Sequence, residues 1–400
     1  MWRSRWQQND HHDESLVLLF FSKYFSIIFR KILDRGGELM IKLKDIGTFE
    51  ELPEIAQNIY EGNIPALQAA IAAGWDIEQG IVLSKYTTLS PLDLALLSEK
   101  LDVVKLLVEH GVNLNVQRNP AFLNAVRYCK EDIVRYVAAQ GAKLDMLNQV
   151  GSGAYKEAYY GNKNNIPLIH ELGLDLKQHG GAVLRKAVSD HDRKTIAYLL
   201  DQGVDINYNL PDMVYPYCAT PLTVAARMGN IGMVKYLIEQ GADVTLAEKD
   251  GERAYTIAVS NKNAALADYL KSLEPPEFHD VENKKVELKK FKLTDELVSF
   301  LTGDKLRLEL APNEYEIEYI DFFALTDTIE LKVGRQKYLR LSAGIDNYSH
   351  LQLVWNPKKK GQIGCYDIEH KEYADLCSFP AFLEKPEEYL VKFMEGELEG

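Results

Sequence analysis

A glycine recurs through the first two thirds of this 400-residue chain, each time directly after an apolar segment of helical periodicity. It occupies Gly74, Gly111, Gly141, Gly173, Gly203 and Gly241, at intervals of 30 to 38 residues. A glycine in this place ends a helix in the left-handed conformation, which it adopts without a steric penalty. A period of this length indicates a repeat of short helix pairs, which bury their apolar faces only by stacking on one another.

Each interval contains the same two elements. A turn enters a first helix, as in "SPLDLA" at Ser90 and "TPLTVA" at Thr220, and a second helix such as "MVKYLIEQG" precedes the glycine. The segment from Thr220 matches the T-P-L-H-x-A signature at all but one position, so the chain resembles the ankyrin repeat from about Pro53 to Leu273. The resemblance implies an all-α solenoid of about seven helix-turn-helix units, with atypical first and last copies as caps. The fourth copy departs from the pattern at Glu157, and the fifth at His191 and Asp192.

The resemblance also implies a protein-binding surface. In such a stack the connection between one repeat and the next projects as a finger, and the C-terminal ends of the first helices line a palm. The longest intervals predict two extended fingers, at residues 79–89 and 208–217. Aromatic and basic side chains on a rigid exposed surface are typical of interface hot spots, although packing against neighbouring helices is an open alternative. We expect partner contacts from the following side chains of the fingers and the palm: Tyr86, Arg127, Tyr128, Tyr159, Tyr160, Tyr208, Leu210, Met213, Tyr215, Tyr217, Arg227 and Met228.

Charge and cysteine usage narrow the class of partner. A net charge of −13 argues against nucleic acid, which requires clustered Lys and Arg. The cysteines are scattered without metal-ligand spacing, which predicts free thiols in a reducing cytoplasm. Neither the histidines nor the acidic residues form a catalytic pattern. We therefore expect a binding protein rather than an enzyme, with no metal, cofactor or small-molecule substrate.

Residues 1–39 do not fit the repeat. The apolar run Leu16–Phe29 contains Lys23 and is too short to cross a membrane comfortably. The segment Arg35–Glu38, just before Met40, resembles a purine-rich ribosome-binding site translated in frame. We expect residues 1–39 to be a non-native or disordered hydrophobic extension. A membrane-associating helix and an ordinary core helix are the alternatives.

The last part of the chain has a different period. Residues 274–293 contain two prolines and mixed charge, which predicts a linker. From residue 294 to 400, segments such as "TIELKV" and "LQLVWN" alternate apolar and polar residues, as strands with one covered face do. We expect an α+β domain with an antiparallel sheet and a helix on one face. Ser378 is expected to begin a C-terminal helix that restarts at Pro386.

A second resemblance lies within this domain. Gly361 and Ile363 are followed by "SFPAFL" from Ser378 to Leu383, a pattern that resembles the tail of the SUKH superfamily over about residues 337–389. This resemblance implies a bacterial immunity protein that binds and neutralises a toxin domain. Acid-rich strands would attract a basic toxin. A generic scaffold or adaptor in the bacterial cytoplasm is the alternative.

Overall fold

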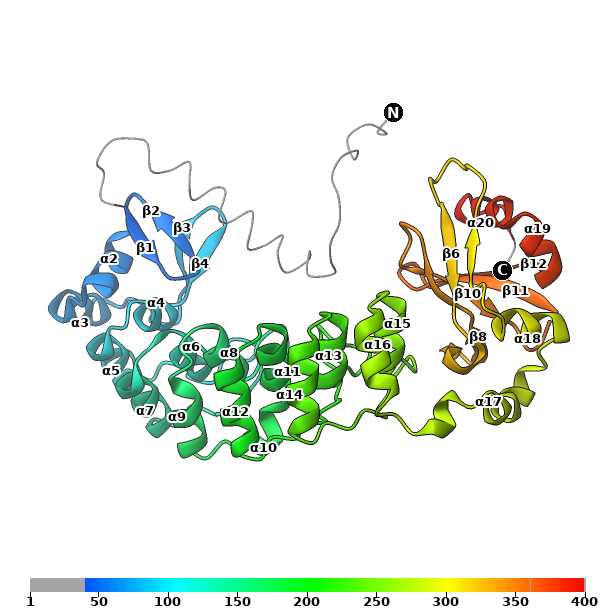
Figure 1. Ribbon diagram of the computed structural model, residues 1–400. Helices are drawn as coiled ribbons and strands as arrows, with labels where there is room; N and C mark the ends of the chain where they lie inside the picture. The colour runs from blue at the N-terminus through cyan, green and yellow to red at the C-terminus, as the bar shows by residue number, and fades with distance from the viewer. Residues whose placement is uncertain (1–39, 360, 399–400) are drawn as a thin grey trace. The chain divides into compact units, whose positions relative to one another are not determined.

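The computed structural model describes residues 40–359 and 361–398 (Figure 1). The expectations for residues 1–39 lie outside these described ranges. The chain divides into two compact units, Met1–Asn113 and Leu114–Gly400. Within the described ranges, no helix has the length and the apolar character that crossing a membrane requires.

The first unit combines helix pairs with two small hairpins. Its helices are α2 (Glu54–Glu61), α3 (Ile64–Ala72), α4 (Pro91–Leu97) and α5 (Leu101–Glu109). Its strands form the antiparallel pairs β1 (Ile41–Leu43) with β2 (Gly47–Phe49) and β3 (Ile81–Ser84) with β4 (Thr87–Leu89). The Ser90 side chain accepts a hydrogen bond of 3.0 Å from the amide of Asp93, which caps the buried helix α4. The finger expected at residues 79–89 is therefore a β-hairpin.

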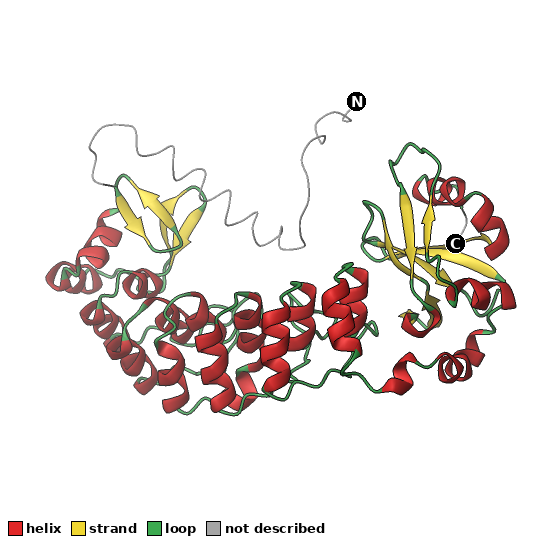
Figure 2. Cartoon of the chain, viewed as in Figure 1, coloured by secondary structure: helices red, strands yellow, loops and turns green. Residues whose placement is uncertain are grey.

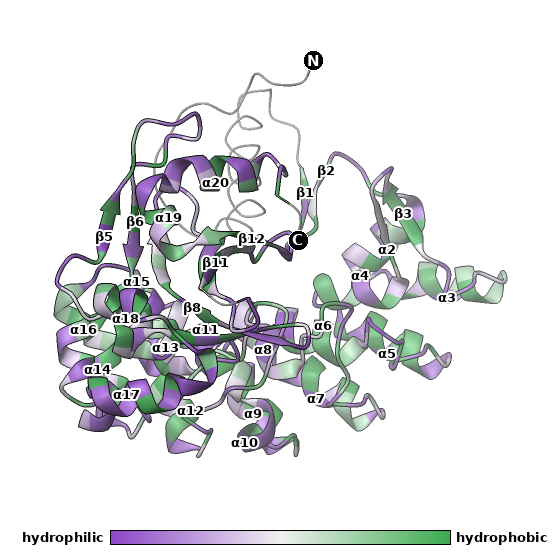
Figure 3. Cartoon of the chain, turned by 90° about the vertical axis from the view of Figure 1, so that its right-hand side faces the viewer, coloured by the Kyte–Doolittle hydropathy of each residue, from purple (hydrophilic) through white to green (hydrophobic). Residues whose placement is uncertain are grey.

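The second unit begins with a stack of helix pairs, whose first helices pack in the order α6, α8, α11, α13, α15 (Figure 2). The pairs are α6 (Ala121–Tyr128) with α7 (Glu131–Ala139), α8 (Ala154–Tyr160) with α9 (Asn165–Glu171), α11 (Gly181–Ser189) with α12 (Arg193–Asp201), α13 (Pro221–Arg227) with α14 (Ile231–Glu239), and α15 (Ala254–Ser260) with α16 (Ala264–Lys271). Apolar and polar residues alternate along these helices, as Figure 3 shows, and the apolar faces meet within the stack.

Backbone geometry confirms the role of the recurrent glycines. All six have φ between 80° and 104°, so each ends its helix in the left-handed region. In the fifth copy the turn between the two helices contains His191, with φ of 57°. The next residue, Asp192, accepts a hydrogen bond of 3.1 Å from the amide of Thr195 and caps α12. The departure from the pattern thus preserves the turn.

The expected linker at residues 274–293 is instead folded. It forms η1 (Pro276–His279), α17 (Val281–Glu287) and η2 (Leu288–Phe291). Leu288 and Phe291 are buried in the core of the C-terminal domain, and the indole nitrogen of Trp355 donates a 2.9 Å hydrogen bond to the carbonyl of Phe291. Most of the charged side chains of this segment are exposed, although Glu274 is buried and pairs with Arg253, and this composition suggested a linker.

The C-terminal domain contains two antiparallel sheets rather than the single sheet that was expected. The five-stranded sheet has the order β12-β11-β10-β8-β7, and the three-stranded sheet has the order β5-β6-β9. The strands are β5 (Arg307–Glu309), β6 (Tyr319–Phe322), β7 (Ile329–Val333), β8 (Gln336–Arg340), β9 (Ser342–Ile345), β10 (Leu351–Trp355), β11 (Gln362–Asp367) and β12 (Glu372–Ser378). The segment "YLRLSA", which also alternates apolar and polar residues, divides at Leu341, so that β8 pairs in one sheet and β9 in the other.

Helices cover one face of the larger sheet. They are α18 (Asp295–Leu301), α19 (Phe379–Glu384) and α20 (Pro386–Met394), and a short turn, η3 (Leu325–Asp327), precedes β7. Leu297, Phe382 and Leu390 from these helices share a core with Trp355 of the sheet. Ser378 lies at the N-cap of α19 as predicted, although its side chain makes no cap hydrogen bond. Pro386 begins α20, as predicted.

The last helix pair contacts the C-terminal domain within the second unit. Val259 of α15 packs against a cluster of Phe323, Ile329 and Ala343. The Tyr255 hydroxyl donates a 3.2 Å hydrogen bond to Asp327, and both residues are buried. The end of the helical stack is therefore covered by the β-rich domain.

Candidate functional site

The predicted palm residues of the second unit lie at the C-terminal ends of the first helices. Arg127 and Tyr128 end α6, Tyr160 ends α8, and Arg227 ends α13 with Met228 directly after it. Met228 and Tyr160 are about two fifths exposed, at 43% and 40%. The palm thus presents an apolar and an aromatic side chain that a partner can reach.

An arginine and a buried glutamate explain the irregular fourth copy. Arg127 Nη1 donates to Glu157 Oε2 at 2.7 Å, and Asn148 Nδ2 donates to Glu157 Oε1 at 2.9 Å. Glu157 is only 6% exposed, so its carboxylate ties the palm of one repeat to the finger of the next. The guanidinium of Arg127 also lies 5.3 Å from the ring centre of Tyr128 and 5.9 Å from that of Tyr160. Where the repeat pattern has a small residue that packs against the next helix, this copy has Glu157, which is held by hydrogen bonds from Arg127 and Asn148.

The two adjacent palm tyrosines differ in accessibility. Tyr159 is 3% exposed, and its hydroxyl donates a 3.0 Å hydrogen bond to Asp190. Burial and the Asp190 carboxylate raise the pKa of Tyr159 above its ordinary range. Partial burial raises the pKa of Tyr160 to about 12. The structure thus places Tyr159 in the packing of the stack and Tyr160 on the accessible surface.

The extended finger at residues 202–220 is built around a buried arginine. Arg185 of α11 donates to Asp212 Oδ2 at 2.8 Å and to the carbonyl of Ala219 at 2.9 Å. Its guanidinium lies 4.7 Å from the ring centre of Tyr208 and 5.0 Å from that of Tyr215. Tyr208 and Tyr215 therefore pack within the protein and hold the finger in place, which is the alternative to the partner contact expected from the sequence. The sequence did not single out Arg185, because nothing local distinguishes it from a solvated arginine.

The tip of the same finger is apolar and exposed. Leu210 and Met213 are 60% and 72% exposed. At its base, Tyr217 packs edge-on against Tyr215, with ring centres 6.0 Å apart, and Arg227 lies 5.2 Å from the Tyr217 ring centre. The finger is thus an anchored loop with two accessible apolar side chains at its end.

In the first unit, Tyr86 lies at the turn of the β3–β4 hairpin and is 86% exposed. The neighbouring Val82 is 62% exposed. The ammonium group of Lys85 lies 4.6 Å from the centre of the Tyr86 ring. This hairpin is a second finger with an accessible aromatic residue.

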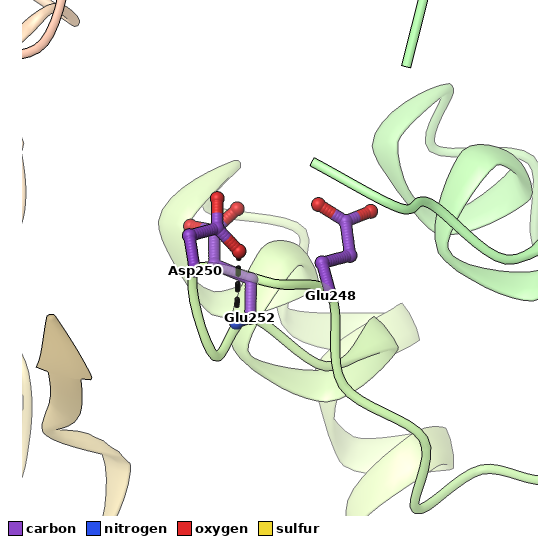
Figure 4. A group of neighbouring side chains, drawn as sticks. All are labelled: Glu248, Asp250 and Glu252. Atoms are coloured by element: carbon purple, nitrogen blue, oxygen red, sulfur yellow. Dashed lines mark hydrogen bonds between the residues drawn. The ribbon is translucent and has the colours of Figure 1, made fainter. Parts of the chain in front are cut away.

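A cluster of three carboxylates lies in the finger before α15 (Figure 4). Ligand atoms of Glu248, Asp250 and Glu252 lie within 4.8 Å of one another. Burial raises the pKa of Glu248 to about 8, against the opposing effect of Arg227. Burial also raises the pKa of Asp250. The sequence analysis did not identify these residues, although the segment "EKDGE" is visibly acidic.

Two arginines balance this carboxylate cluster. Arg227 contacts Glu248 at 2.7 Å and Glu252 at 3.3 Å, and Arg340 of β8 contacts Glu252 at 2.8 Å. Carboxylate oxygens are the ligands that Ca²⁺ and Mg²⁺ prefer, but here a bound cation would face two guanidinium groups. The arrangement therefore serves best as a network of arginine–carboxyl hydrogen bonds that holds the finger to the palm and to the C-terminal domain.

Comparisons with known protein families agree with the repeat. The family model "Ankyrin repeats (3 copies)" matches residues 184–280, and the model "Ankyrin repeat" matches residues 89–119. Among solved structures, the human ASB11 ankyrin repeat domain is similar at 20% sequence identity, with a TM-score of 0.42. That alignment covers 56% of this chain and 99% of the other.

Three curated proteins are similar over part of their length. The ankyrin repeat and KH domain-containing protein mask-1 of Caenorhabditis elegans is 24% identical over 168 residues, which are 42% of this chain. The putative ankyrin repeat protein R598 of Acanthamoeba polyphaga mimivirus is 24% identical over 179 residues, or 44% of this chain. The palmitoyltransferase AKR1 of Lachancea kluyveri is 32% identical over 75 residues, or 19% of this chain. The matches span 6%, 55% and 10% of the lengths of these relatives.

Proposed function

We propose that this chain, which contains ankyrin repeats, is a protein-binding module that contacts its partner through the palm and the extended finger of the second unit. The observation that best supports this is the combination of accessible apolar side chains with a rigid base. Leu210 and Met213 are exposed at the tip of a finger that Arg185 and Asp212 anchor. Preorganised apolar side chains of this kind lose little conformational entropy on binding.

The proposed binding includes no chemical step. In the carboxylate cluster of the described residues, Glu248 and Glu252 pair with Arg227 and Arg340, and Asp250 accepts a hydrogen bond from the amide of Glu252. The cluster thus forms part of a structural contact with the C-terminal domain. The module would act by occupying a partner rather than by transforming a substrate.

Cross-linking in the source cell, followed by mass spectrometry, would identify the partner. Its affinity for the purified chain would then be measured by calorimetry. Replacing Leu210 and Met213 together by Ser should weaken binding at least tenfold, since both side chains are accessible. Val286→Ser is the matched control, because Val286 is 63% exposed on α17, away from the palm. Equal affinities for all three proteins would contradict the proposal.

Among protein-binding modules, we propose that the chain is a cytoplasmic immunity protein that neutralises a basic toxin domain. The support is the resemblance of residues 337–389 to the SUKH tail, together with an acidic surface on the same domain. Glu309, Glu316 and Glu318 line a shallow hollow beside the β5–β6 hairpin. Such a surface would accelerate association with a basic protein.

The immunity proposal predicts that a toxin domain is encoded beside this gene, and that domain provides the test. The purified chain should inhibit its activity, and Glu309→Lys with Glu318→Lys should slow association more at low salt than at high salt. Glu384→Lys, an exposed site on α19, is the control for charge alone. Lack of inhibition, with a different protein cross-linked to the palm, would favour a scaffold or adaptor instead.

A further inference from the structure

One finger is missing from the row in the second unit. Residues 140–153 and 202–220 form fingers, whereas the segment between them, residues 172–180, folds into the helical turn α10 (Leu176–His179). The connection thus stays close to the helices instead of projecting. The two flanking fingers are left with a gap between them.

Two glycines beside this gap allow the chain to pack closely against the start of α11. A Cβ atom at Gly181 would lie 2.1 Å from the ring of Tyr208, and one at Gly180 would lie 2.6 Å from the carbonyl oxygen of Leu176. No side chain fits at either position without displacing backbone or the half-buried ring of Tyr208. Tyr208 therefore lies directly on the start of α11, and the next residue, Ala182, adds only a methyl group to the floor.

A cavity of about 160 Å³ opens at this place. Leu144, Leu147 and Tyr155 contribute to one wall, Tyr208 and Asp212 to the other, and Ala182 to the floor. Leu147 is 54% exposed, and its neighbour Val150 is 47% exposed. On the opposite side, the finger of Tyr208 also contains the exposed Leu210 and Met213. The cavity is thus bordered on both sides by fingers with accessible apolar residues.

Polar groups in the cavity are available to a ligand. Asp145, Lys156 and Gln178 line it. Among the described residues their side chains have no hydrogen-bond or ion-pair partner. The wall therefore combines an apolar lining with a free carboxylate, a free ammonium group and a free amide. A ring with one polar edge matches this lining better than a purely aliphatic group does.

We propose that this cavity, the finger gap, receives a tyrosine side chain from the partner protein, with the flanking partner residues lying on Leu147 and Met213. The inference rests on the proposed function, because it names the anchor of the same binding event. Asp145 accepts the hydrogen bond of the phenol hydroxyl, and Lys156 donates to its oxygen.

The size of the gap selects this occupant. Cavities of about 150 Å³ accommodate one benzene ring, whereas small-molecule sites are usually about 300–1,000 Å³. A single aromatic ring fits the space, and a ligand of the size of a nucleotide exceeds it. The remaining affinity then comes from the exposed fingertips, which only a protein partner spans.

The test uses p-cresol, the side-chain analogue of tyrosine, titrated into the full chain by ligand-observed nuclear magnetic resonance. We expect a dissociation constant on the order of 1 mM, and weaker binding of toluene, which lacks the hydroxyl. Ala182→Leu should weaken p-cresol binding at least tenfold, because the larger side chain fills the floor from a partly exposed position. Ala265→Leu makes the same change at an exposed site on α16 and should have no effect.

A second variant leaves the floor intact. Lys156→Met should reduce the preference for p-cresol over toluene without abolishing binding of the ring. Non-saturable p-cresol binding, or equal binding by the Ala182→Leu protein, would overturn the inference. If partner affinity still depended on Leu210 and Met213, the proposed function would stand and only the anchor would be wrong.

Discussion

Three arginines of the first helices use the same chemistry. Arg185 and Arg227 donate to carboxylates from fingers, and Arg127 donates to Glu157 of α8. Each of the three also lies against a tyrosine ring. A planar guanidinium can do both at once, which an ammonium group cannot do as well. The individual pairs therefore hold fingers and neighbouring helices together, and their loss should appear as lost stability.

Arg185→Met should lower the free energy of unfolding by about 2–4 kcal/mol, because it leaves Asp212 without its cation and two tyrosine rings without their neighbour. The fully buried position of Arg185 makes this cost larger than for a surface pair. Urea denaturation measures the change. Lys186→Met is the control, since Lys186 is partly exposed and its pair with Asp190 is a helical surface contact. Equal losses for the two variants would contradict the assigned role.

Glu248 should make stability depend on pH. Its pKa is raised from 4.5 to about 8 by burial. Between these values the folded state holds a proton that the unfolded state releases, so the free energy of unfolding falls as the pH rises from about 4.5 to about 8. Glu248→Gln removes this titration. The free energy of unfolding of this variant minus that of the wild type should therefore rise over that pH interval, by on the order of a few kcal/mol.

Urea denaturation at about pH 5 and about pH 8 checks this expectation. Glu369→Gln, at an exposed site, provides the matched control. A stability difference between Glu248→Gln and the wild type that stays constant with pH would show that Glu248 is ionised throughout.

At the scale of elements, each helix of the stack is too short to be stable alone and depends on its buried face. In α14, Met233, Val234 and Leu237 are buried, as their spacing predicts. The same helical spacing in the sequence predicts burial of Ile231, but this first residue of the helix is 36% exposed, so that prediction is wrong.

Leu237→Ala should lower the free energy of unfolding by about 2–5 kcal/mol, because it leaves a cavity between helices that cannot close freely. In a repeat protein the effect spreads mainly to neighbours. Hydrogen exchange should therefore accelerate from about Tyr208 to Leu273 and change little in α4 and α5. Ile231→Ala in the same helix should cost much less. Uniform acceleration over all helix pairs would show a single cooperative unit instead.

At the scale of the whole molecule, the end of the stack does not face solvent. Val259 packs on Phe323 and Ile329, and Arg340 pairs with Glu252 across the same contact. Gly251 permits close approach, since a Cβ there would lie 2.7 Å from a methyl carbon of Ile329. The C-terminal domain thus serves as the cap that terminal repeats normally provide.

Val259→Asp should separate the unfolding of the C-terminal domain from that of the last helix pairs. A carboxylate in this contact has no partner and costs about 2 kcal/mol or more. Scanning calorimetry should resolve an additional transition in the variant. Val286→Asp introduces the same charge at an exposed site and should leave the wild-type profile. An unchanged profile for Val259→Asp would mean that the contact contributes little to stability.

The sequence by itself determined the features that depend on neighbouring residues. Recurrent glycines such as Gly241 predicted where helices end, and alternation predicted strands such as β7, because helix termination and strand amphipathicity are local properties. In β10 both faces are buried, so the expectation of one covered face was wrong for that strand. The repeat period also predicted that palm residues such as Arg127 and Tyr128 lie at the C-terminal ends of the first helices. These elements were predictable without any knowledge of what they contact.

Only the tertiary structure decided which side chains meet. Arg340 reaches Glu252 across 88 positions of sequence, and Phe291 joins the core through Trp355. The finger gap exists because one connection coils close to the helices while its two neighbours project. Contacts between distant residues depend on the stacking angle and the path of each finger, and no local pattern encodes these. For the same reason Tyr208 and Tyr160, equivalent as exposed aromatic candidates in the sequence, have different places: one lies over a glycine, and the other is accessible on the palm.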